Sequence, residues 1–268
     1  MLSLPLQLIL SLLGGAFIHN IDLASLMRTM TKKLDYFVKI ERAGKMVFEK
    51  EYHDISTDPD GRKRDLLNER EHNLLGMHEV TTFLDKQPAG RILDIGCGPG
   101  WLLSHLSADW IKYGIEISTF ASSVASKYGE IYNGNFEEYH HTGEKFDIIV
   151  IYHVIEHLHD PLAALIKIHD LLADGGTLIL GTPDFDSAAA RRYGKNFRML
   201  DDPTHISLFS NDSMHRCLRD HNFEIQKVEY PYFDTIWFNK ESIMKIFDVD
   251  TVSPPFYGSI MTFFCSTK

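Results

Sequence analysis

The chain has 268 residues, of which 44% are hydrophobic and 24% charged, and its formal net charge is −10 at pH 7. This composition is typical of a globular protein, and the length fits one elaborated domain or two small ones. The acidic balance argues against a nucleic-acid partner, because proteins that bind nucleic acids carry clustered Lys and Arg that displace counterions from the phosphates. The three cysteines are widely spaced and form neither a disulfide framework nor a CxxC metal motif. We therefore expect a reducing compartment and a cytoplasmic location.

The N-terminal segment, residues 1–18, is strongly apolar and no Lys or Arg precedes Arg28. A secretory signal would begin with a basic region, which this segment lacks. A peripheral membrane contact through residues 1–18, a docked helix and an over-long start all stay open. Residues 50–64 are polar with Asp-Pro-Asp-Gly at their centre, which predicts a linker. We expect a helical and linker extension over 1–61 and one domain over 62–268.

Beyond the linker, the hydrophobic pattern alternates between helices and short strands. Residues 64–86 have the helical period and are expected to end before Pro88. A second helix is expected over 161–176, with Asp160 as its N-cap and Pro161 at its first position, ending at a glycine pair. A third is expected over 211–223. The expected strands are residues 91–96, 113–117, 130–134, 146–152, 176–182, 224–233 and 258–268. This spacing predicts βαβ units and a largely parallel sheet.

The first expected strand ends in a glycine-rich loop, with Gly96, Gly98 and Gly100 around Cys97. Glycines at the exit of a strand allow a tight turn and close approach of a ligand to backbone N–H groups, so we expect a nucleotide site. The dinucleotide fingerprint G-x-G-x-x-G is absent, because its last glycine is replaced by Trp101. An NAD-dependent oxidoreductase is therefore the weaker alternative.

Two acidic residues flank this loop. Asp94 lies two residues before the first glycine, where its carboxylate would repel a pyrophosphate but attract the ammonium group of S-adenosylmethionine. Glu116 follows Gly96 by twenty residues, at the end of the second strand, where an acid can accept hydrogen bonds from ribose hydroxyls. The pair favours a methyl-donor site.

With these motifs, the stretch from about 75 to 235 resembles class I S-adenosylmethionine-dependent methyltransferases. The resemblance implies an α/β fold with a doubly wound, seven-stranded, mostly parallel sheet of order 3-2-1-4-5-7-6, the last strand antiparallel. Asn135 stands where many members carry Asp near the adenine, and Phe136 could pack on that ring. The residues implied to bind the cofactor are Asp94, Gly96, Cys97, Gly98, Gly100, Glu116, Ile117, Asn135, Phe136, Tyr152 and His153.

The segment YHVIEHLHDP, residues 152–161, contains the pattern H-x-x-E-H, which is also found in inverted zinc peptidases. A peptidase needs this pattern on a helix, whereas here it straddles the end of a β-branched strand. In some ubiquinone-pathway O-methyltransferases, which this segment resembles, a Glu at the place of His153 binds a divalent metal together with the Glu-His pair. In the wider family that pair, here Glu156 and His157, supports the pocket without metal. We therefore assign no metal ligands. Whether His153, Glu156 and His157 bind a divalent metal is left open.

The acceptor side is expected after the fifth strand, in substrate-side insertions around 183–210 and 236–258. His205 matches family members with a histidine before Phe-Ser, so we predict that it acts as general base or orients the acceptor, against a structural core histidine. A basic cluster, defined as Arg191, Arg192, Lys195 and Arg198, could hold a phosphate or carboxylate of the acceptor or be a solvated surface.

The predicted function is methyl transfer from S-adenosylmethionine to an oxygen, less favoured a nitrogen, of a small-molecule acceptor. Pro-Pro-Phe-Tyr-Gly, residues 254–258, resembles methyltransferases of surface-polysaccharide synthesis, so the first choice of acceptor is a sugar or sugar-nucleotide. The alternative is a polyprenylated phenol or quinol. A non-catalytic subunit that binds the cofactor is the alternative of another class. We expect a monomer or homodimer.

Overall fold

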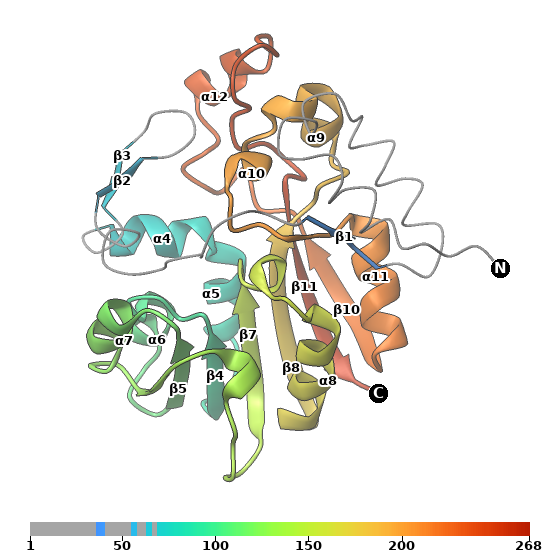
Figure 1. The fold of residues 1–268 in the computed structure, drawn as a ribbon. Coiled ribbons are helices and arrows are strands. Elements are labelled where there is room, and N and C mark those ends of the chain that lie inside the picture. The colour runs from blue at the N-terminus through green and yellow to red at the C-terminus, as the bar shows by residue number, and fades with distance from the viewer. Residues whose placement is uncertain (1–35, 41–54, 58–62, 66–68) are drawn as a thin grey trace, which may run out of the picture.

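A computed structural model of the protein describes residues 36–40, 55–57, 63–65 and 69–268. The expected N-terminal extension, including the apolar residues 1–18, falls almost wholly outside the described residues. The described part is built around a seven-stranded sheet of order β10-β11-β8-β7-β4-β5-β6 (Figure 1). Among the described residues, no helix is both long and apolar enough to cross a membrane.

The sheet has the predicted topology. Its strands are β4 (Arg91–Ile95), β5 (Ile111–Glu116), β6 (Glu130–Asn133), β7 (Phe146–Tyr152), β8 (Leu172–Pro183), β10 (Phe223–Glu229) and β11 (Ile260–Thr267). The five strands from β4 to β8 pair in parallel, and β11 runs antiparallel to both β8 and β10. Counted in chain order within this sheet, the strands follow 3-2-1-4-5-7-6, so the expected doubly wound fold is confirmed.

Helices cover both faces of the sheet. The principal ones are α4 (Arg70–Gly76), α5 (His78–Leu84), α6 (Trp101–His105), α7 (Thr119–Ala125), α8 (Pro161–Leu171) and α11 (Asn211–Asp220). One core packs alternate strand residues against α8 and α11, and the other packs the remaining residues against α5 and α6. Burial on both faces explains why the strand sequences are apolar runs rather than alternating ones.

Two predicted helices are shorter than the sequence suggested. The expected helix 64–86 is broken within its described part, because Met77 has a non-helical ψ of 36° between α4 and α5. The expected helix 161–176 begins as predicted, with the Asp160 side chain capping the Ala163 N–H, but it ends at Leu171. The next residue already pairs with β7, so the glycine pair belongs to an irregular start of β8. Sheet pairing has overridden helical propensity there.

The carboxyl ends of the parallel strands share one edge, which is the upper edge in Figure 1. Above it lie α9 (Ala188–Tyr193), α10 (Arg198–Asp201) and α12 (Lys240–Lys245), in the segments that the sequence predicted to face the acceptor. A two-stranded pairing of β1 (Val38–Lys39) with β9 (Ser207–Leu208) also lies here. A separate hairpin joins β2 (Ile55–Thr57) and β3 (Lys63–Asp65). Ligands of open α/β sheets bind at this carboxyl edge.

Candidate active site

The glycine-rich loop leaves β4 and turns into α6 with three glycines at positive φ. Gly96, Gly98 and Gly100 have φ angles of 72°, 52° and 82°, a region that side chains other than glycine adopt at a cost. A Cβ on Gly100 would lie 2.9 Å from the Ala125 Cα, whereas a Cβ on Gly98 would meet nothing within 4 Å. Gly100 therefore lets α7 pack closely, and Gly98 leaves its face of the loop open to a ligand.

Glu116 fixes the shape of this loop. Its Oε2 accepts a hydrogen bond from the Gly98 N–H at 2.8 Å, and its Oε1 accepts one from the Ser118 N–H at 2.8 Å. A carboxylate oxygen can accept two hydrogen bonds, so ribose hydroxyls remain compatible with this arrangement. The neighbouring Ile117 is exposed and presents apolar surface beside it. Both positions suit the nucleoside contacts predicted for them.

Asp94 is a buried carboxyl group at the end of β4. Burial, and then the charge of Glu116, raise its pKa to about 7. Two neighbouring acids without a cation favour the protonated form of one of them. A ligand ammonium placed beside Asp94 would reverse that preference, so the residues of this site fit S-adenosylmethionine.

Three other residues predicted to bind the cofactor have side chains that are less accessible to a ligand. The Asn135 Oδ1 accepts a hydrogen bond from the Glu137 N–H and caps a 3-10 helix, η2 (Phe136–Glu138). Phe136 is buried in the core, and the Lys167 ammonium lies 4.8 Å from the centre of its ring. The Cys97 side chain is also buried, and burial raises the pKa of its thiol well above the usual value. Any contact of Cys97 with a ligand would therefore be through its backbone.

The H-x-x-E-H segment follows β7 and forms a 3-10 helix, η3 (Ile155–His157), rather than the α-helix of a peptidase. Glu156 is fully buried at its centre. Its Oε1 lies 3.2 Å from the His153 Nδ1, and its Oε2 accepts a hydrogen bond from the Thr182 hydroxyl at 3.1 Å. Burial raises the pKa of Glu156, but the hydrogen bond from His153 and the charges of His157, His153 and His205 outweigh it and bring the pKa to about 2. The carboxylate is ionised at neutral pH.

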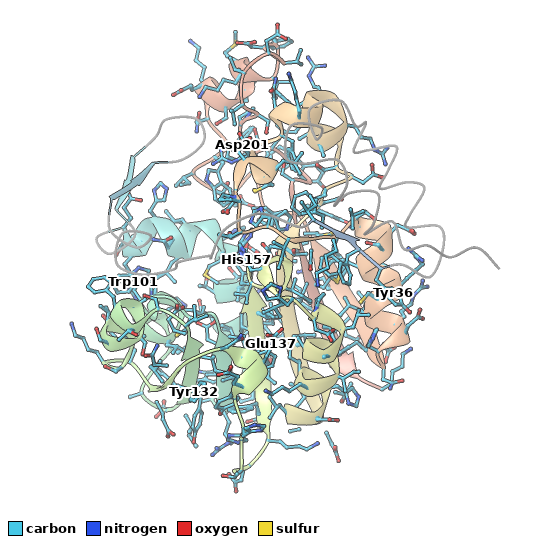
Figure 2. All side chains as sticks on the ribbon, viewed as in Figure 1. Tyr36, Trp101, Tyr132, Glu137, His157 and Asp201 are labelled. Carbon is cyan, nitrogen blue, oxygen red and sulfur yellow. The ribbon has the colours of Figure 1, made fainter. Side chains whose placement is uncertain are left out.

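The structure brings His205 to this same carboxylate, 49 residues along the chain. The His205 Nε2 lies 4.0 Å from the Glu156 Oε1 and 3.9 Å from the Asp202 Oδ2, and its Nδ1 donates a hydrogen bond to the Met199 carbonyl at 2.5 Å. Burial lowers the pKa of His205. Figure 2 shows the adjacent His157 just beyond the upper end of β7. His205 is thus buried, with Nδ1 bonded to the backbone and Nε2 facing two carboxylates. This position suits a role in orienting the Glu156 side chain.

The candidate metal set differs from the one that the sequence suggested. Possible ligand atoms of Glu156, His157 and His205 all lie within 4.8 Å of one another, and His153 is not part of this group. The Nδ1 of His157 donates to the Thr204 carbonyl at 3.0 Å. A carboxylate with two imidazoles could hold a borderline divalent metal.

A buried network beside Tyr152 was not anticipated. The Tyr152 ring lies on Gly181, where a Cβ would come within 2.3 Å of the ring, and its hydroxyl donates to the Glu79 Oε1 at 3.0 Å. The same oxygen accepts a hydrogen bond from the Thr262 hydroxyl at 2.8 Å. Burial raises the pKa of Glu79. The sequence signal for this network was Glu79, an acidic residue next to the buried Val80 in α5. The Tyr152 hydroxyl therefore points to α5 and ties β7 to that helix.

The basic cluster is largely engaged by protein groups. Arg191 makes two hydrogen bonds to the Asp186 carboxylate, at 3.0 and 2.6 Å. The Arg192 Nε donates to the Ile246 carbonyl at 2.9 Å. Arg192 thus joins the segment after β8 to the segment between β10 and β11, and Arg191 is paired within its own segment, which weakens the expectation that these two cations bind an acceptor phosphate.

Comparison with known proteins decides the family. A family model described as a methyltransferase domain matches residues 67–228, which is more than half of the chain. The chain belongs to this methyltransferase family. It is therefore an enzyme that transfers a methyl group, and S-adenosylmethionine is the donor.

Curated relatives of this methyltransferase match over a shorter stretch. The ubiquinone biosynthesis O-methyltransferase of Ruegeria pomeroyi is 37% identical over 103 residues, which cover 34% of this chain and 40% of the relative. An uncharacterised protein of Methanocaldococcus jannaschii is 28% identical over 124 residues, 46% of this chain and 59% of the relative. The match with the ubiquinone relative thus spans about two fifths of that protein's length.

Solved structures support the fold of the methyltransferase. An S-adenosylmethionine-dependent methyltransferase of Thermotoga maritima, described as a possible histamine N-methyltransferase, superposes with a TM-score of 0.53 at 22% identity, covering 74% of this chain and 91% of that one. The magnesium protoporphyrin IX methyltransferase of Synechocystis, solved with bound S-adenosylhomocysteine, gives 0.52 at 16% identity, covering 74% and 84%. At these identities the likeness concerns the fold alone.

Proposed function

We propose that this enzyme methylates a hydroxyl oxygen of a phenol or quinol ring that carries an apolar tail. The observation that carries the proposal is an apolar surface, defined as Phe233, Phe238, Met244, Phe247 and Tyr257, exposed in the segment between β10 and β11. Phe233 contacts Phe238 and Tyr257 with ring centroids 5.2 and 5.4 Å apart. Exposed apolar side chains gathered in this way are typical of binding surfaces.

The position of this surface supports the assignment. The segment starts where β10 reaches the carboxyl edge and includes α12, which lies beyond that edge in Figure 1. It also reaches α5, because the His78 Nε2 lies 3.8 Å from the Asp234 Oδ2. An acceptor tail on the surface would leave the acceptor ring near the ends of β7 and β8. The name of the Ruegeria relative, a ubiquinone biosynthesis O-methyltransferase, agrees with such an acceptor.

The proposed donor site is the set predicted from the sequence, with the Glu116 carboxylate and the open face of the glycine loop toward the nucleoside and Asp94 toward the methionyl ammonium. Its members are Asp94, Gly96, Cys97, Gly98, Gly100, Glu116, Ile117, Asn135, Phe136, Tyr152 and His153. His205 is proposed to orient the catalytic groups through Glu156. Both oxygens of Glu156 already take part in protein contacts, so we expect turnover without a bound metal.

A sugar or sugar-nucleotide is the second candidate acceptor, because aromatic faces such as those of Phe233 and Phe238 also stack on sugars. The test is to incubate the purified full chain with S-adenosylmethionine and either a prenylated catechol or a set of sugar-nucleotides, and to measure S-adenosylhomocysteine. We expect product with the catechol alone. Turnover with sugar-nucleotides alone would establish the second candidate. Donor binding without product from either class would mean that the acceptor belongs to another chemical class.

A further inference from the structure

We infer that His153, oriented by Glu156, is the general base that takes the proton from the acceptor hydroxyl, with Nε2 as the accepting atom. The inference rests on the proposed function and assigns the base within it. It differs from the role as base that the sequence suggested for His205. Three features of the described residues carry it: the backbone of His153, its hydrogen bond to Glu156, and its exposure.

The backbone of His153 is held in an unfavourable conformation. Its φ is 55°, and in the described residues Asn222 is the other non-glycine residue with a positive φ. Such a conformation costs about 1–3 kcal/mol and persists where the surroundings impose it, frequently at functional sites. Here the His153 N–H donates to the Gly181 carbonyl at 2.9 Å, which anchors the turn from β7 into η3.

This turn lies against the glycine loop. A Cβ on Gly96 would come within 2.2 Å of the Val154 Cγ2, so the residue after His153 packs directly on the first loop glycine. β7 and β4 are also neighbouring parallel strands, with Ile151 paired to Ile95 at their carboxyl ends. His153 therefore lies next to the donor loop, where a base for methyl transfer is needed.

The contact with Glu156 fixes the tautomer. The distance from the His153 Nδ1 to the Glu156 Oε1 is 3.2 Å. The other oxygen of Glu156 accepts a hydrogen bond from the Thr182 hydroxyl, and a carboxylate oxygen can only accept, so Nδ1 carries the proton. The lone pair is then on Nε2. A buried carboxylate that orients an imidazole in this way is the arrangement by which a histidine is prepared as a general base.

Exposure separates His153 from His205. The side chain of His153 is 32% exposed, whereas that of His205 is 7% exposed. The Nε2 of His205 faces the carboxylates of Glu156 and Asp202 rather than an open surface. His153 can therefore touch an acceptor, and His205 acts on the reaction through Glu156 as a positioning residue.

The reaction step balances without a further reagent. The acceptor hydroxyl gives its proton to the His153 Nε2 while its oxygen forms a bond to the methyl carbon of the donor. The carbon–sulfur bond breaks, its electron pair stays on sulfur, and S-adenosylhomocysteine results. The imidazolium next to Glu156 then releases the proton to solvent. The products are the methyl ether, S-adenosylhomocysteine and one proton.

The test compares His153→Asn, His205→Asn and His159→Asn in the full chain, with a prenylated catechol as acceptor. Asn tolerates a positive φ, so His153→Asn should keep the fold. We expect its kcat to fall about 100-fold or more, the usual contribution of a general base, and the loss to persist at saturating S-adenosylmethionine, so that weaker donor binding does not account for it. The kcat of His205→Asn should fall less, by about tenfold. His159 is exposed on the same segment, so His159→Asn is the matched control, and its kcat should not change.

A second variant gives a readout that a structural role would not move. His153→Gly relieves the positive φ but also removes the hydrogen bond to Glu156, and added imidazole should restore its turnover in a saturable manner. Wild-type turnover in His153→Asn, or a failure of imidazole to rescue His153→Gly, would overturn the assignment of the base alone. Absence of S-adenosylhomocysteine from the wild type with every acceptor would instead refute the proposed function, and the inference with it.

Discussion

Asp94 and Glu156 are both buried carboxyl groups at the carboxyl edge, yet their pKa values shift in opposite directions. Asp94 is buried next to another acid, Glu116, and its pKa rises to about 7. Burial also opposes the ionised form of Glu156, but a hydrogen bond from His153 and nearby imidazoles lower its pKa to about 2. The two pKa shifts differ because the neighbouring charged groups differ, not because of burial. Asp94 therefore predicts how donor binding depends on pH, and Glu156 predicts how stability does.

Donor binding should depend on pH through Asp94. Below pH 7 the carboxyl is protonated, so an ammonium ligand must first displace that proton, which costs about 1.4 kcal/mol for each pH unit. We expect the dissociation constant of S-adenosylmethionine to fall by roughly tenfold or more between pH 5.5 and pH 7 and proton release to accompany binding, as measured by calorimetry in two buffers of different ionisation enthalpy. Asp94→Ala should abolish binding. Affinity that is independent of pH would contradict the assignment.

Glu156 should contribute stability that is lost in acid. Its pKa is lower in the folded chain than the usual 4.5, so its contribution is complete above pH 4.5 and disappears as the pH falls toward 2. The lowered pKa corresponds to about 3 kcal/mol at neutral pH. Urea unfolding of Glu156→Gln at pH 7 should show a loss of that order and a shallower acid dependence. Equal stability of variant and wild type at pH 7 would rule out this role.

At the scale of elements, the glycine loop couples the donor site to helix packing. Gly100 begins α6 at a φ of 82° and touches the end of α7 through Ala125. Gly175, at the irregular start of β8, has a similar φ of 74° but nothing within 4 Å of a Cβ. The two glycines share the conformational requirement and differ in the contact.

Alanine variants of Gly100 and Gly175 allow the contact between the glycine loop and α7 to be measured. Gly175→Ala should cost about 1–2 kcal/mol of stability, the penalty of the left-handed conformation alone. Gly100→Ala should cost about 1–3 kcal/mol more, because α7 must move, and it should also weaken donor binding. Urea unfolding and calorimetry measure the two effects. A Gly100→Ala variant as stable as Gly175→Ala would show that α7 does not constrain the loop.

At the scale of the whole molecule, the acceptor side combines segments that are far apart in the chain. The segment between β10 and β11 crosses the carboxyl edge to α4, where a Cβ on Gly76 would lie 3.4 Å from the Trp237 ring. The segment after β8 supplies Asp202 and His205, which lie beside Glu156. Hydrogen bonds from the Arg192 Nε to the Ile246 carbonyl and from the Tyr193 hydroxyl to the Lys245 carbonyl join these two segments.

This arrangement predicts which part of an acceptor the apolar surface binds. The double variant Phe233→Ser and Phe238→Ser should raise KM for a prenylated catechol about tenfold, because about 1.4 kcal/mol of apolar contact is lost. KM for an unprenylated catechol and kcat for both should not change. Steady-state kinetics with the two acceptors measures this. An equal rise in KM for both acceptors would mean that the rings contact the head group instead.

The fold and the donor loop could be read from the sequence because they depend on local patterns. Strand runs, the spacing from Gly96 to Glu116 and the Asp160 cap each lie within a short stretch, and helical or strand periodicity and turn chemistry act over such distances. The break at Met77 and the early end of α8 could not be predicted, since packing of α5 and pairing of β8 with β7 decide them. The Tyr152–Glu79–Thr262 contact likewise joins three elements separated by up to 183 residues.

The sequence by itself determined that this chain forms a doubly wound sheet with an acid-flanked glycine loop, because β-branched runs, glycines and carboxylates express their preferences locally. Only the tertiary structure decided how the histidines are used. It placed His205 next to Glu156, left the His153 side chain 32% exposed on a strained turn, and bound Arg192 to the Ile246 carbonyl. The physical reason is that the roles of these groups depend on desolvation and on neighbours distant in sequence, which exist only once the chain has folded.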